Sequence, residues 1–502
     1  YTTNEKDARG TSSNYLIGNR GRKYVMSENY GFNIGYDFNE DQRLTYKFTR
    51  ANYDWEYKDP ESYIRKGDTV IWPGKDIDDS KYASFYGTRG WRAYNMHSLT
   101  YNDQKNKIHA HIGMTDYFKD GYTQPGYTKG TLDGNLNGSG DKYSYPSKSI
   151  DFDLNKRWAL GNHNLLAGTS YGRDKFDETI YSIKDWKSWS NSGSVTQKAG
   201  GKDKYWSLYA QDKWNFAPKW TAYIGGRYDH YEDYDGYLSG DNDKGSHSYH
   251  KFSPKLSLDY AVNPDTNVYL SYGKSFNTPI LYQLFRYSTR MGLIYPNSGL
   301  TPETTDTWEL GLKKKIANKT DIHADVFYAK TEDYIRLMSY EGGQGKGKRY
   351  ENNGDEKTHG FEVSLTQRHS DIWTSYINYT WQTAKNNGYK DYDVPRHLLH
   401  LGTTYNKAPW TINLDGMFIS NRYLDITPGD TKKYDYHSGH FRSRDAYFLM
   451  NLSTNYQFNK NFGLQLGVNN LFDRKYYDED ISTQHYYIGD GRTYTLTARY
   501  SF

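Results

Sequence analysis

The last ten residues of the chain alternate strictly between two kinds of side chain. In "TYTLTARYSF", which ends at Phe502, aromatic and aliphatic residues occupy one parity, and Thr, Arg and Ser occupy the other. A repeat of two residues is the period of a β-strand with one apolar and one polar face, and it does not fit the 3.6-residue period of a helix. The same period recurs in "YWSLYAQDKW", where Trp206, Leu208 and Trp214 share one face. The chain is therefore expected to consist of two-faced strands.

The composition restricts how such strands can be buried. Only 35% of the 502 residues are hydrophobic and the mean hydropathy is -1.00, so one large apolar core is hard to assemble. No window approaches about 18 consecutive apolar residues, which excludes transmembrane helices. A membrane-spanning β-strand, by contrast, needs an apolar residue only at every second position over about ten residues. The 54 Tyr and 46 Gly residues suit strands whose rings lie at a membrane surface.

The charged and reactive residues exclude several classes of function. The 64 basic and 60 acidic residues give a formal net charge of +4, and so small a surplus argues against nucleic acid as a partner. The chain has no Cys, so it cannot form a disulfide, a thiolate metal site or a Cys nucleophile. Ser, His and Asp are widely scattered, and the metalloprotease motif H-E-x-x-H is absent. We therefore do not expect an enzyme.

Short turns and long polar segments alternate along the chain. Nine tight turns each join two runs of roughly ten residues, from "FNEDQ" at 38 to 42 to "NKNF" at 459 to 462. Long polar segments such as 231–251 lie between these hairpins. Short connections at one end of the strands and long ones at the other are typical of bacterial outer-membrane barrels. The predicted fold is all-β, a transmembrane antiparallel β-barrel with about 19 strands in this chain.

Three stretches resemble the signature segments of one family. The chain ends with "LGVNNLFDRKYYDEDISTQHYYIGDGRTYTLTARYSF", and "SPKLSLDYAVNPDTNVYLSYGKSFNTPILYQLF" and "GLTPETTDTWELGLKKK" precede it. In this order they resemble the barrels of TonB-dependent outer-membrane receptors, from about residue 30 to Phe502. The resemblance implies that the terminal aromatic residue is a signal for outer-membrane insertion. It divides the chain into 1–29, an external loop or partial N-terminal segment, and 30–502, the transmembrane barrel with long extracellular loops.

The resemblance also implies parts that this sequence does not show. Family members place a plug domain ahead of a barrel of about 22 strands, and nothing resembling a plug or an energy-coupling segment occurs here. A count of about 19 strands is odd, whereas single-chain bacterial barrels have even numbers. We expect a second polypeptide to supply the plug and about three further strands, with TonB acting through the plug. The alternative is that the missing part belongs to one longer chain.

Within the family the chain most resembles the vitamin B12 (cobalamin) receptors, through "SFNTPILYQLF" and the spacing from "NNLFDRKYYDEDI" to the carboxy terminus. The expected function is active uptake of a scarce metal chelate, with cobalamin or another corrinoid as the first candidate. A ferric-siderophore or haem receptor is the first alternative, although no His lies between Phe276 and Glu303, where the haem receptors of the family carry one. A plug-free diffusion porin is the second alternative.

One segment near the expected external mouth, "NTPILYQLFRYSTRMGLIYPNSGL", is rich in aromatic and amide groups. Such groups would hold a large planar ligand by stacking and hydrogen bonds, although they are also typical of an interfacial aromatic girdle. The candidate ligand-binding residues are Tyr282, Gln283, Phe285, Arg286, Tyr287 and Tyr295 in this segment, with Tyr231, Tyr234, Tyr436 and Tyr486 in other loops.

Carboxylates and imidazoles in the predicted loops are candidate metal ligands. Asp116 and Asp120 in "TDYFKDGY" have a spacing that resembles a calcium-carrying loop of the cobalamin receptors. Calcium prefers several hard oxygen ligands, so calcium is the candidate loop cofactor at these two residues. Loop carboxylates and imidazoles are more often only solvated. The competing acidic cluster is Asp229, Asp233, Asp235, Asp241 and Asp243, and the loop imidazoles that could serve haem are His247, His250, His437 and His440.

Overall fold

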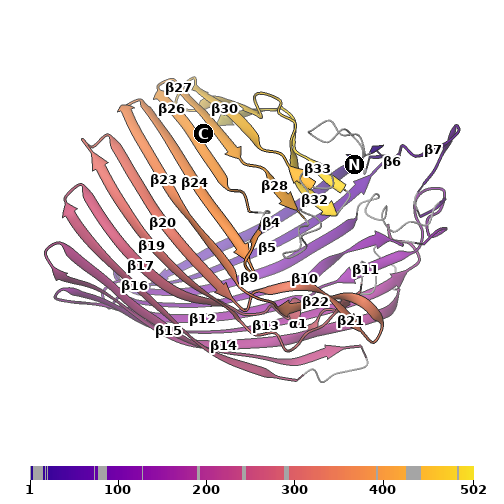
Figure 1. Ribbon diagram of the computed structural model, residues 1–502, viewed down its shortest axis with the longest axis horizontal. Helices are drawn as coiled ribbons and strands as arrows, with labels where there is room; N and C mark the ends of the chain where they lie inside the picture. The colour runs from indigo at the N-terminus through magenta and orange to yellow at the C-terminus, as the bar shows by residue number, and fades with distance from the viewer. Residues whose placement is uncertain are drawn as a thin grey trace.

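The computed structural model is an all-β structure in which long antiparallel strands form one strongly curved sheet (Figure 1). It describes residues 2–3, 15–16, 18–19, 21–72, 74–76, 88–126, 128–188, 193–239, 245–287, 293–391, 394–424, 442–482 and 485–501. Within these ranges the single helix, α1 (Leu281–Phe285), has five residues. No helix in the described part of the chain is long and apolar enough to cross a membrane.

The long strands make up the barrel wall, and the short ones lie in the connections. The wall strands are β4 (Arg22–Asp37), β5 (Gln42–Lys58), β9 (Arg89–Asp103), β10 (Ile108–Pro125), β11 (Gly140–Ser144), β12 (Ser147–Leu160), β13 (His163–Ile183), β14 (Ser194–Ala217), β15 (Trp220–Leu238), β16 (His247–Asn263), β17 (Thr266–Asn277), β19 (Glu303–Ile316), β20 (Thr320–Glu332), β23 (Glu356–Ser370), β24 (Trp373–Asn386), β25 (Tyr389–Asp391), β26 (His397–Lys407), β27 (Trp410–Ile419), β30 (Tyr447–Gln457), β31 (Phe462–Asn469) and β34 (Thr493–Tyr500). The others are β1 (Thr2–Thr3), β2 (Tyr15–Leu16), β3 (Gly18–Asn19), β6 (Glu61–Ser62), β7 (Arg65–Lys66), β8 (Thr69–Val70), β18 (Ile294–Tyr295), β21 (Ile335–Gly342), β22 (Gly345–Asn352), β28 (Arg422–Leu424), β29 (Arg442–Arg444), β32 (Tyr477–Ser482) and β33 (His485–Ile488).

Each of the nine predicted short turns joins two strands that pair with each other. The first connects β4 to β5 and the last connects β30 to β31. Asn side chains shape both turns: Asn39 Oδ1 accepts the N–H of Asp41 at 3.0 Å, and Asn459 Oδ1 accepts the N–H of Asn461 at 2.9 Å. Asn favours tight turns because its side chain can bond the backbone two residues further on. The predicted hairpins are confirmed, and their turns all lie at one end of the wall.

Two wall strands are interrupted near proline. β11 and β12 each pair with β10 on one side and with β13 on the other. Only Tyr145 and Pro146 separate β11 from β12. β25 and β26 both pair with β24, and Pro395 lies between them. Proline has no N–H to donate to a ladder, so strands tend to break at it. The barrel order of the described residues therefore holds 21 strands, where about 19 were expected, because each interrupted strand counts twice.

The junction between β34 and β4 differs from the rest of the wall. The two strands are neighbours in the closed order of the barrel, but the ladder partners of β4 lie on β5 and those of β34 lie on β31. All 16 residues of β4 and all 8 residues of β34 are exposed. This junction is the least covered part of the wall. The wall itself begins at Arg22, ahead of the boundary at residue 30 that the resemblance suggested.

The two faces of the wall differ as the period of two predicts. On β14 the side chains of Trp206 and Leu208 are 41% and 56% exposed, whereas Ser207 between them is buried. The Ser207 hydroxyl lies 2.5 Å from the Ser170 hydroxyl of β13 on the inner face. An apolar outer face and a polar inner face are the arrangement of a barrel that stands in lipid.

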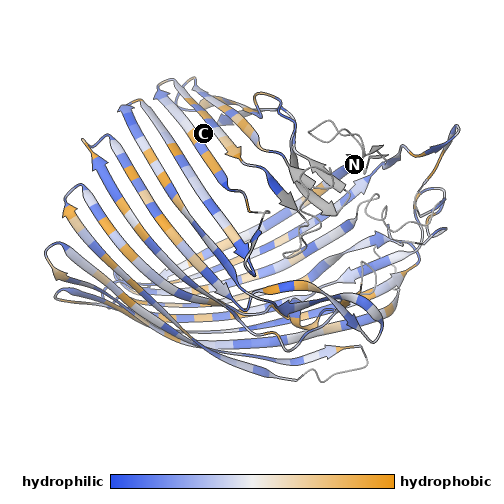
Figure 2. Cartoon of the chain, in the orientation of Figure 1, coloured by the Kyte–Doolittle hydropathy of each residue, from blue (hydrophilic) through white to orange (hydrophobic). Residues whose placement is uncertain are grey.

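Aromatic residues border the apolar part of the outer face in two rows. Toward the long loops, the rings of Trp206 and Tyr228 lie 5.7 Å apart, and toward the short turns the rings of Trp220 and Tyr260 lie 4.4 Å apart. On β14 the stretch from Trp206 to Trp214 measures about 26 Å along the strand, close to the apolar band of about 25 Å in outer-membrane barrels. Figure 2 shows hydrophobic residues concentrated on the part of the strands nearer the short turns. The membrane-spanning segments therefore lie between these two aromatic rows.

We expect Leu466→Arg to impair barrel assembly far more than Gln465→Arg. Leu466 is 45% exposed on the outer face of β31, whereas Gln465 donates to the Ser453 hydroxyl at 3.0 Å on the inner face. A basic side chain on the lipid face costs about 2 to 4 kcal/mol at mid-bilayer, while the lumen admits water. Heat-modifiability on gels measures the folded fraction of each variant. Equal folded fractions in the two variants would show that the faces are assigned wrongly.

Candidate ligand-binding site

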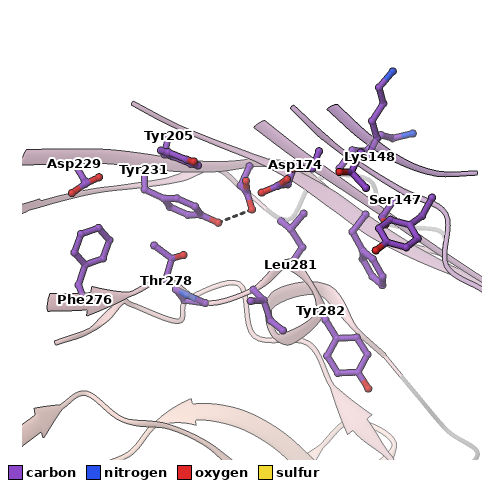
Figure 3. Close-up of a pocket in the computed structure, with 18 of the residues that line it drawn as sticks. Ser147, Lys148, Asp174, Tyr205, Asp229, Tyr231, Phe276, Thr278, Leu281 and Tyr282 are labelled. Carbon is purple, nitrogen blue, oxygen red and sulfur yellow. Dashed lines mark hydrogen bonds between the residues drawn. The ribbon is translucent and has the colours of Figure 1, made fainter. Parts of the chain in front are cut away.

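A cavity of about 940 Å³ lies on the inner face of the wall, toward the long loops. One side is formed by β12 to β15, and the other by the end of β17 and the segment that leads into α1 (Figure 3). The side chains that define it are Asp174, Asp203, Tyr205, Arg227, Asp229 and Tyr231 on the wall and Phe276, Thr278, Leu281 and Tyr282 on the opposite side.

The α1 segment is held against the wall by one aromatic side chain. Phe285 is 1% exposed and fits between Gly201 of β14 and Gly236 of β15. A Cβ atom at Gly201 would lie 2.4 Å from Phe285 Cε2, and one at Gly236 would lie 2.3 Å from Phe285 Cε1. The buried residues Leu281, Leu284 and Leu300 complete this cluster. Only glycine at both wall positions leaves room for the ring, so the two glycines form its slot.

Gln283 in α1 and Arg286 directly after it also serve the fold of the segment. Gln283 Oε1 accepts the backbone N–H of Ile280 at 3.0 Å, which satisfies one of the free N–H groups at the start of the helix. The Arg286 guanidinium lies 4.5 Å from the ring centre of Tyr282, a cation–π contact. Of the predicted ligand residues in α1, Tyr282 is the one that lines the cavity.

Buried polar groups on the wall face the cavity. Tyr231 donates to Asp203 Oδ2 at 3.0 Å, the contact dashed in Figure 3. Arg227 donates from Nε to Asp229 Oδ1 at 2.8 Å and from its terminal nitrogen to the Ser170 hydroxyl at 3.0 Å. Among the described groups, Asp203 Oδ1 and Asp229 Oδ2 are buried without a hydrogen-bond partner. These oxygens can accept hydrogen bonds from a ligand that enters the cavity.

The charge on Asp203 depends on its surroundings. It lies on the loop side of Trp206, outside the membrane-spanning part of β14. Burial, together with the negative charge of the nearby Asp174 carboxyl, raises the pKa of the Asp203 carboxyl to about 7. A carboxyl that is partly protonated near neutral pH can donate as well as accept a hydrogen bond. The cavity therefore offers aromatic faces, a paired guanidinium and carboxyl groups to an incoming molecule.

A second buried acid lies behind the α1 segment. Glu178 is on β13, on the loop side of Tyr171, which pairs with Trp206 of the aromatic row, so it is outside the membrane-spanning part. Its side chain is fully buried, and neither carboxyl oxygen has a hydrogen-bond partner among the described residues. Burial raises the pKa of Glu178 to about 7, and the positive charge of Arg286 opposes that rise. The positive charge of Arg286 thus favours the ionised form of Glu178 on the barrel wall.

Residues 1–471 match the protein family described as "TonB dependent receptor-like, beta-barrel". The chain belongs to the TonB-dependent receptor β-barrel family. The receptor is 24% identical over 348 residues to the "Ferric enterobactin receptor" of Pseudomonas aeruginosa, a match that covers 62% of this chain and 43% of that protein. It is 24% identical over 319 residues to the "Probable TonB-dependent receptor BfrD" of Bordetella pertussis, which covers 59% of this chain and 40% of that protein.

Solved structures show the same fold. The "Copper transporter OprC" superimposes with a TM-score of 0.72 at 14% identity, and the match covers 99% of the receptor chain and 74% of that chain. The ferripyoverdine receptor of the outer membrane of Pseudomonas aeruginosa superimposes with a TM-score of 0.70 at 17% identity, covering 96% and 66% of the two chains. The receptor chain spans about two fifths of the length of the curated relatives it matches. Homologues in this family are bacterial outer-membrane proteins, and the receptor is located there too.

The other predicted ligand residues of the receptor lie apart from the cavity. Tyr287 and Tyr295 are edge-to-face neighbours at 6.3 Å, and Tyr295 donates to the Gly345 carbonyl at 2.9 Å, which ties it to the small sheet of β18, β21 and β22. Tyr234 lies on the outer face, among basic side chains. Tyr436 is outside the described residues, and of Tyr486 only the backbone in β33 is described. Tyr231 and Tyr282 are thus the two predicted residues that line the cavity.

The predicted calcium ligands do not converge in the receptor. Asp120 forms an ion pair with Arg92 at 3.2 Å, and a β-bulge begins at Asp116 in the same strand. A guanidinium next to Asp120 competes with a cation for its oxygens. No group of three or more His, Asp or Glu side chains in the described part of the chain is placed to hold a metal ion. Calcium at this position remains a prediction without support from the geometry.

The described members of the competing acidic cluster and of the loop imidazoles make contacts with neighbouring side chains of the protein. Asp233 is buried and lies 3.3 Å from His247 Nδ1. Asp235 pairs with Lys202 on the outer face. His250 Nδ1 lies 2.6 Å from the Tyr228 hydroxyl. The remaining members of both predicted sets lie outside the described residues, namely Asp241, Asp243, His437 and His440.

Sequence reasoning missed several residues that the receptor fold brings together. Asp203, Tyr205 and Arg227 share the polar parity of their strands, and that parity was the signal that could have placed them in the lumen. A run with the spacing G-x-S-x-G at 168–172 was also overlooked, although this spacing can mark a hydrolase nucleophile. It lies inside β13 and not at a strand-to-helix turn, and its Ser170 is bonded within the wall. The run therefore gives no support for catalysis.

Phe285→Ala should release the α1 segment from the receptor wall. The change removes a ring that fills the slot between Gly201 and Gly236, and a buried Phe to Ala change typically costs about 3 to 5 kcal/mol. Hydrogen–deuterium exchange of residues 281–286 should then become much faster, while exchange in the wall strands stays slow. Ile280→Ala is the matched control, because Ile280 is 56% exposed. Unchanged protection of the segment in Phe285→Ala would refute the anchoring role.

Packing of the α1 segment should weaken as pH rises. When the α1 segment is packed on the wall, the pKa of Glu178 is about 7, above its ordinary value of 4.5. The packed segment therefore holds the proton on Glu178 more tightly than a segment that has detached from the wall. The resulting stabilisation is fully present below about pH 4.5 and is lost as pH rises through about 7. Exchange of residues 281–286, corrected for the intrinsic rate, should be faster at high than at low pH. Glu178→Gln should abolish this dependence, and an unchanged profile in that variant would assign it to another group.

Proposed function

We propose that this chain forms the wall of an energy-coupled outer-membrane receptor that imports a ferric siderophore. The observation that carries the proposal is the inner cavity beside α1. Its volume of about 940 Å³ lies within the range of small-molecule sites. The rings of Tyr205, Tyr231 and Tyr282 offer aromatic faces to flat catechol or heterocyclic groups.

The polar lining supports an oxygen-rich ligand. A ferric chelate presents many acceptor oxygens, and hydroxyl and guanidinium groups donate hydrogen bonds to such oxygens. Besides Arg227, the cavity is lined by the hydroxyl side chains of Thr115, Ser147, Ser149, Ser253, Ser275 and Thr278. A hydroxyl-rich and aromatic cavity therefore suits a siderophore complex.

The relatives favour iron chelates over corrinoids. A ferric enterobactin receptor and a ferripyoverdine receptor are among the proteins that this chain resembles. Their names describe those proteins, and they lend support to the siderophore alternative raised from the sequence. Neither they nor the cavity residues favour cobalamin, which becomes the second candidate ligand.

Energy coupling is part of the same proposal. In this family a plug domain fills the barrel lumen and passes energy from TonB, and the matched stretch covers only 40% to 43% of the curated relatives named above. A plug on a separate polypeptide gains no support from those relatives. Any further wall strands would enter at the β34–β4 junction, because these two wall strands are exposed along their whole length.

Isothermal titration of the purified protein with a ferric tris-catecholate complex and with cyanocobalamin tests the proposal. We expect binding of the ferric complex, weakened about tenfold or more by Tyr205→Ala. Tyr228→Ala is the matched control, since Tyr228 lies on the outer face of the neighbouring strand. Tight binding of cyanocobalamin without binding of the ferric complex would move the assignment to a corrinoid. A steady large conductance of the assembled protein would instead indicate a diffusion porin.

A further inference from the structure

Five basic side chains stand in register on the outer face of β12, β13 and β14. Lys148 lies opposite Lys175, and Lys175 lies opposite Lys202, so three lysines form one row across three strands. Arg173 lies opposite Lys204 in the next row, two residues closer to the short turns. These five residues are called the basic ladder below. Like charges directly opposite each other destabilise a sheet, so the arrangement calls for a compensating negative charge.

The protein itself compensates only part of this charge. Lys175 pairs with Asp177 at 2.6 Å, Lys202 with Asp235 at 2.7 Å and Lys204 with Glu232 at 3.0 Å. Lys148 and Arg173 are exposed, and neither forms an ion pair with any residue that the structure describes. Asp116 of β10 lies opposite Lys148, although no ion pair joins them. Five basic residues thus face four acidic ones, and Arg173 has no acidic side chain opposite it on either neighbouring strand.

The height of the basic ladder places it in the headgroup layer. Tyr171 lies opposite Trp206 in the aromatic row, and the next outward-facing residues toward the loops are Arg173 and Lys204. The lysine row follows two residues later, so the two rows stand about 7 and 13 Å along the strands from Trp206. The polar layer of a bilayer is about 5 to 8 Å thick on each side of the hydrocarbon core. With the tilt of barrel strands, both rows lie within or just above that layer.

An apolar surface continues directly below the basic ladder. Ile150 lies opposite Arg173 and is 38% exposed, and Leu154 and Leu208 follow on the outer face toward the short turns. A soluble anion would contact only the basic side chains, whereas a lipid would contact both the basic ladder and the apolar surface below it. Phosphate oxygens would meet the basic side chains, and acyl chains would lie along the apolar strip.

We propose that the basic ladder binds the phosphate groups of a phosphorylated lipid in the external leaflet of the outer membrane. The lipid neutralises the excess positive charge of the basic ladder and lowers the repulsion within the lysine row. Tyr234 orients the donors, because its ring centre lies 5.0 Å from Lys204 Nζ and 5.9 Å from both Lys202 Nζ and the Arg173 guanidinium carbon. This lipid site is independent of the ligand in the lumen.

The test uses the double variant Lys148→Gln/Arg173→Gln, because neither change breaks an ion pair. The matched control is Lys156→Gln/Lys314→Gln, two basic residues on the outer face near the short turns. Each protein is purified from the outer membrane in a non-ionic detergent and titrated in native mass spectrometry. The probes are a diphosphorylated glucosamine lipid, the same lipid without phosphates, and inorganic phosphate. Heat-modifiability confirms that every variant is folded.

We expect the diphosphorylated lipid to bind the wild type and the control variant with similar affinity. The double variant should bind it more weakly by about fivefold for each charge removed, and high salt should weaken wild-type binding as well. Equal binding of the lipid without phosphates would overturn the proposal, as would equal affinities for the diphosphorylated lipid in both variants. Inorganic phosphate that competes as strongly as the lipid would identify a soluble-anion site and also overturn it.

Discussion

Backbone hydrogen bonding in lipid is the constraint on which the rest of this structure depends. No water is available within the bilayer core, so each peptide group there needs a partner in the protein, and a closed ladder of strands provides it. Eighteen residues of β10 and 24 of β14 are committed to such ladders. The β34–β4 junction is the least covered part of this ladder, since every residue of both strands is exposed.

The wall strands are longer than a membrane requires, and the residues on the loop side of the aromatic row line the cavity and form the basic ladder. A spanning strand needs about 9 to 11 residues, whereas β13 has 21 and β14 has 24. On the loop side of the aromatic row, the alternation continues above the hydrocarbon layer of the membrane. Lys202 and Lys204 therefore face the headgroups, while Asp203 and Tyr205 between them face the cavity. One short stretch of β14 thus supplies both the ligand site and the proposed lipid site.

The cavity depends on a loop segment that behaves as part of the core. Phe285 fits a slot that exists only because Gly201 and Gly236 have no side chains. This contact brings Leu281 and Tyr282 to the edge of the cavity and places Arg286, whose Nε is buried, near Glu178. An aromatic residue in a loop of this barrel can thus be a structural anchor, and most of the proposed ligand contacts lie on the wall opposite it.

The sequence by itself determined the two-faced strands, the nine hairpins and the aromatic rows, because each is written in spacings of two residues or in turns of a few residues. It also placed Tyr231 and Tyr282 among the ligand candidates. It could not separate Tyr282 from Phe285 three residues later, since only the glycine slot on two distant strands decides which ring is buried. Strand parity could have placed Tyr234 on the outer face and Asp203 and Arg227 in the lumen. The tertiary structure alone decided that Asp203 and Arg227 meet at one cavity beside α1 and that basic residues of three strands stand together. The short turn between β12 and β13 fixes the register of Lys148 with Lys175, whereas a long connection joins β13 to β14, so the register of Lys175 with Lys202 depends on long-range pairing.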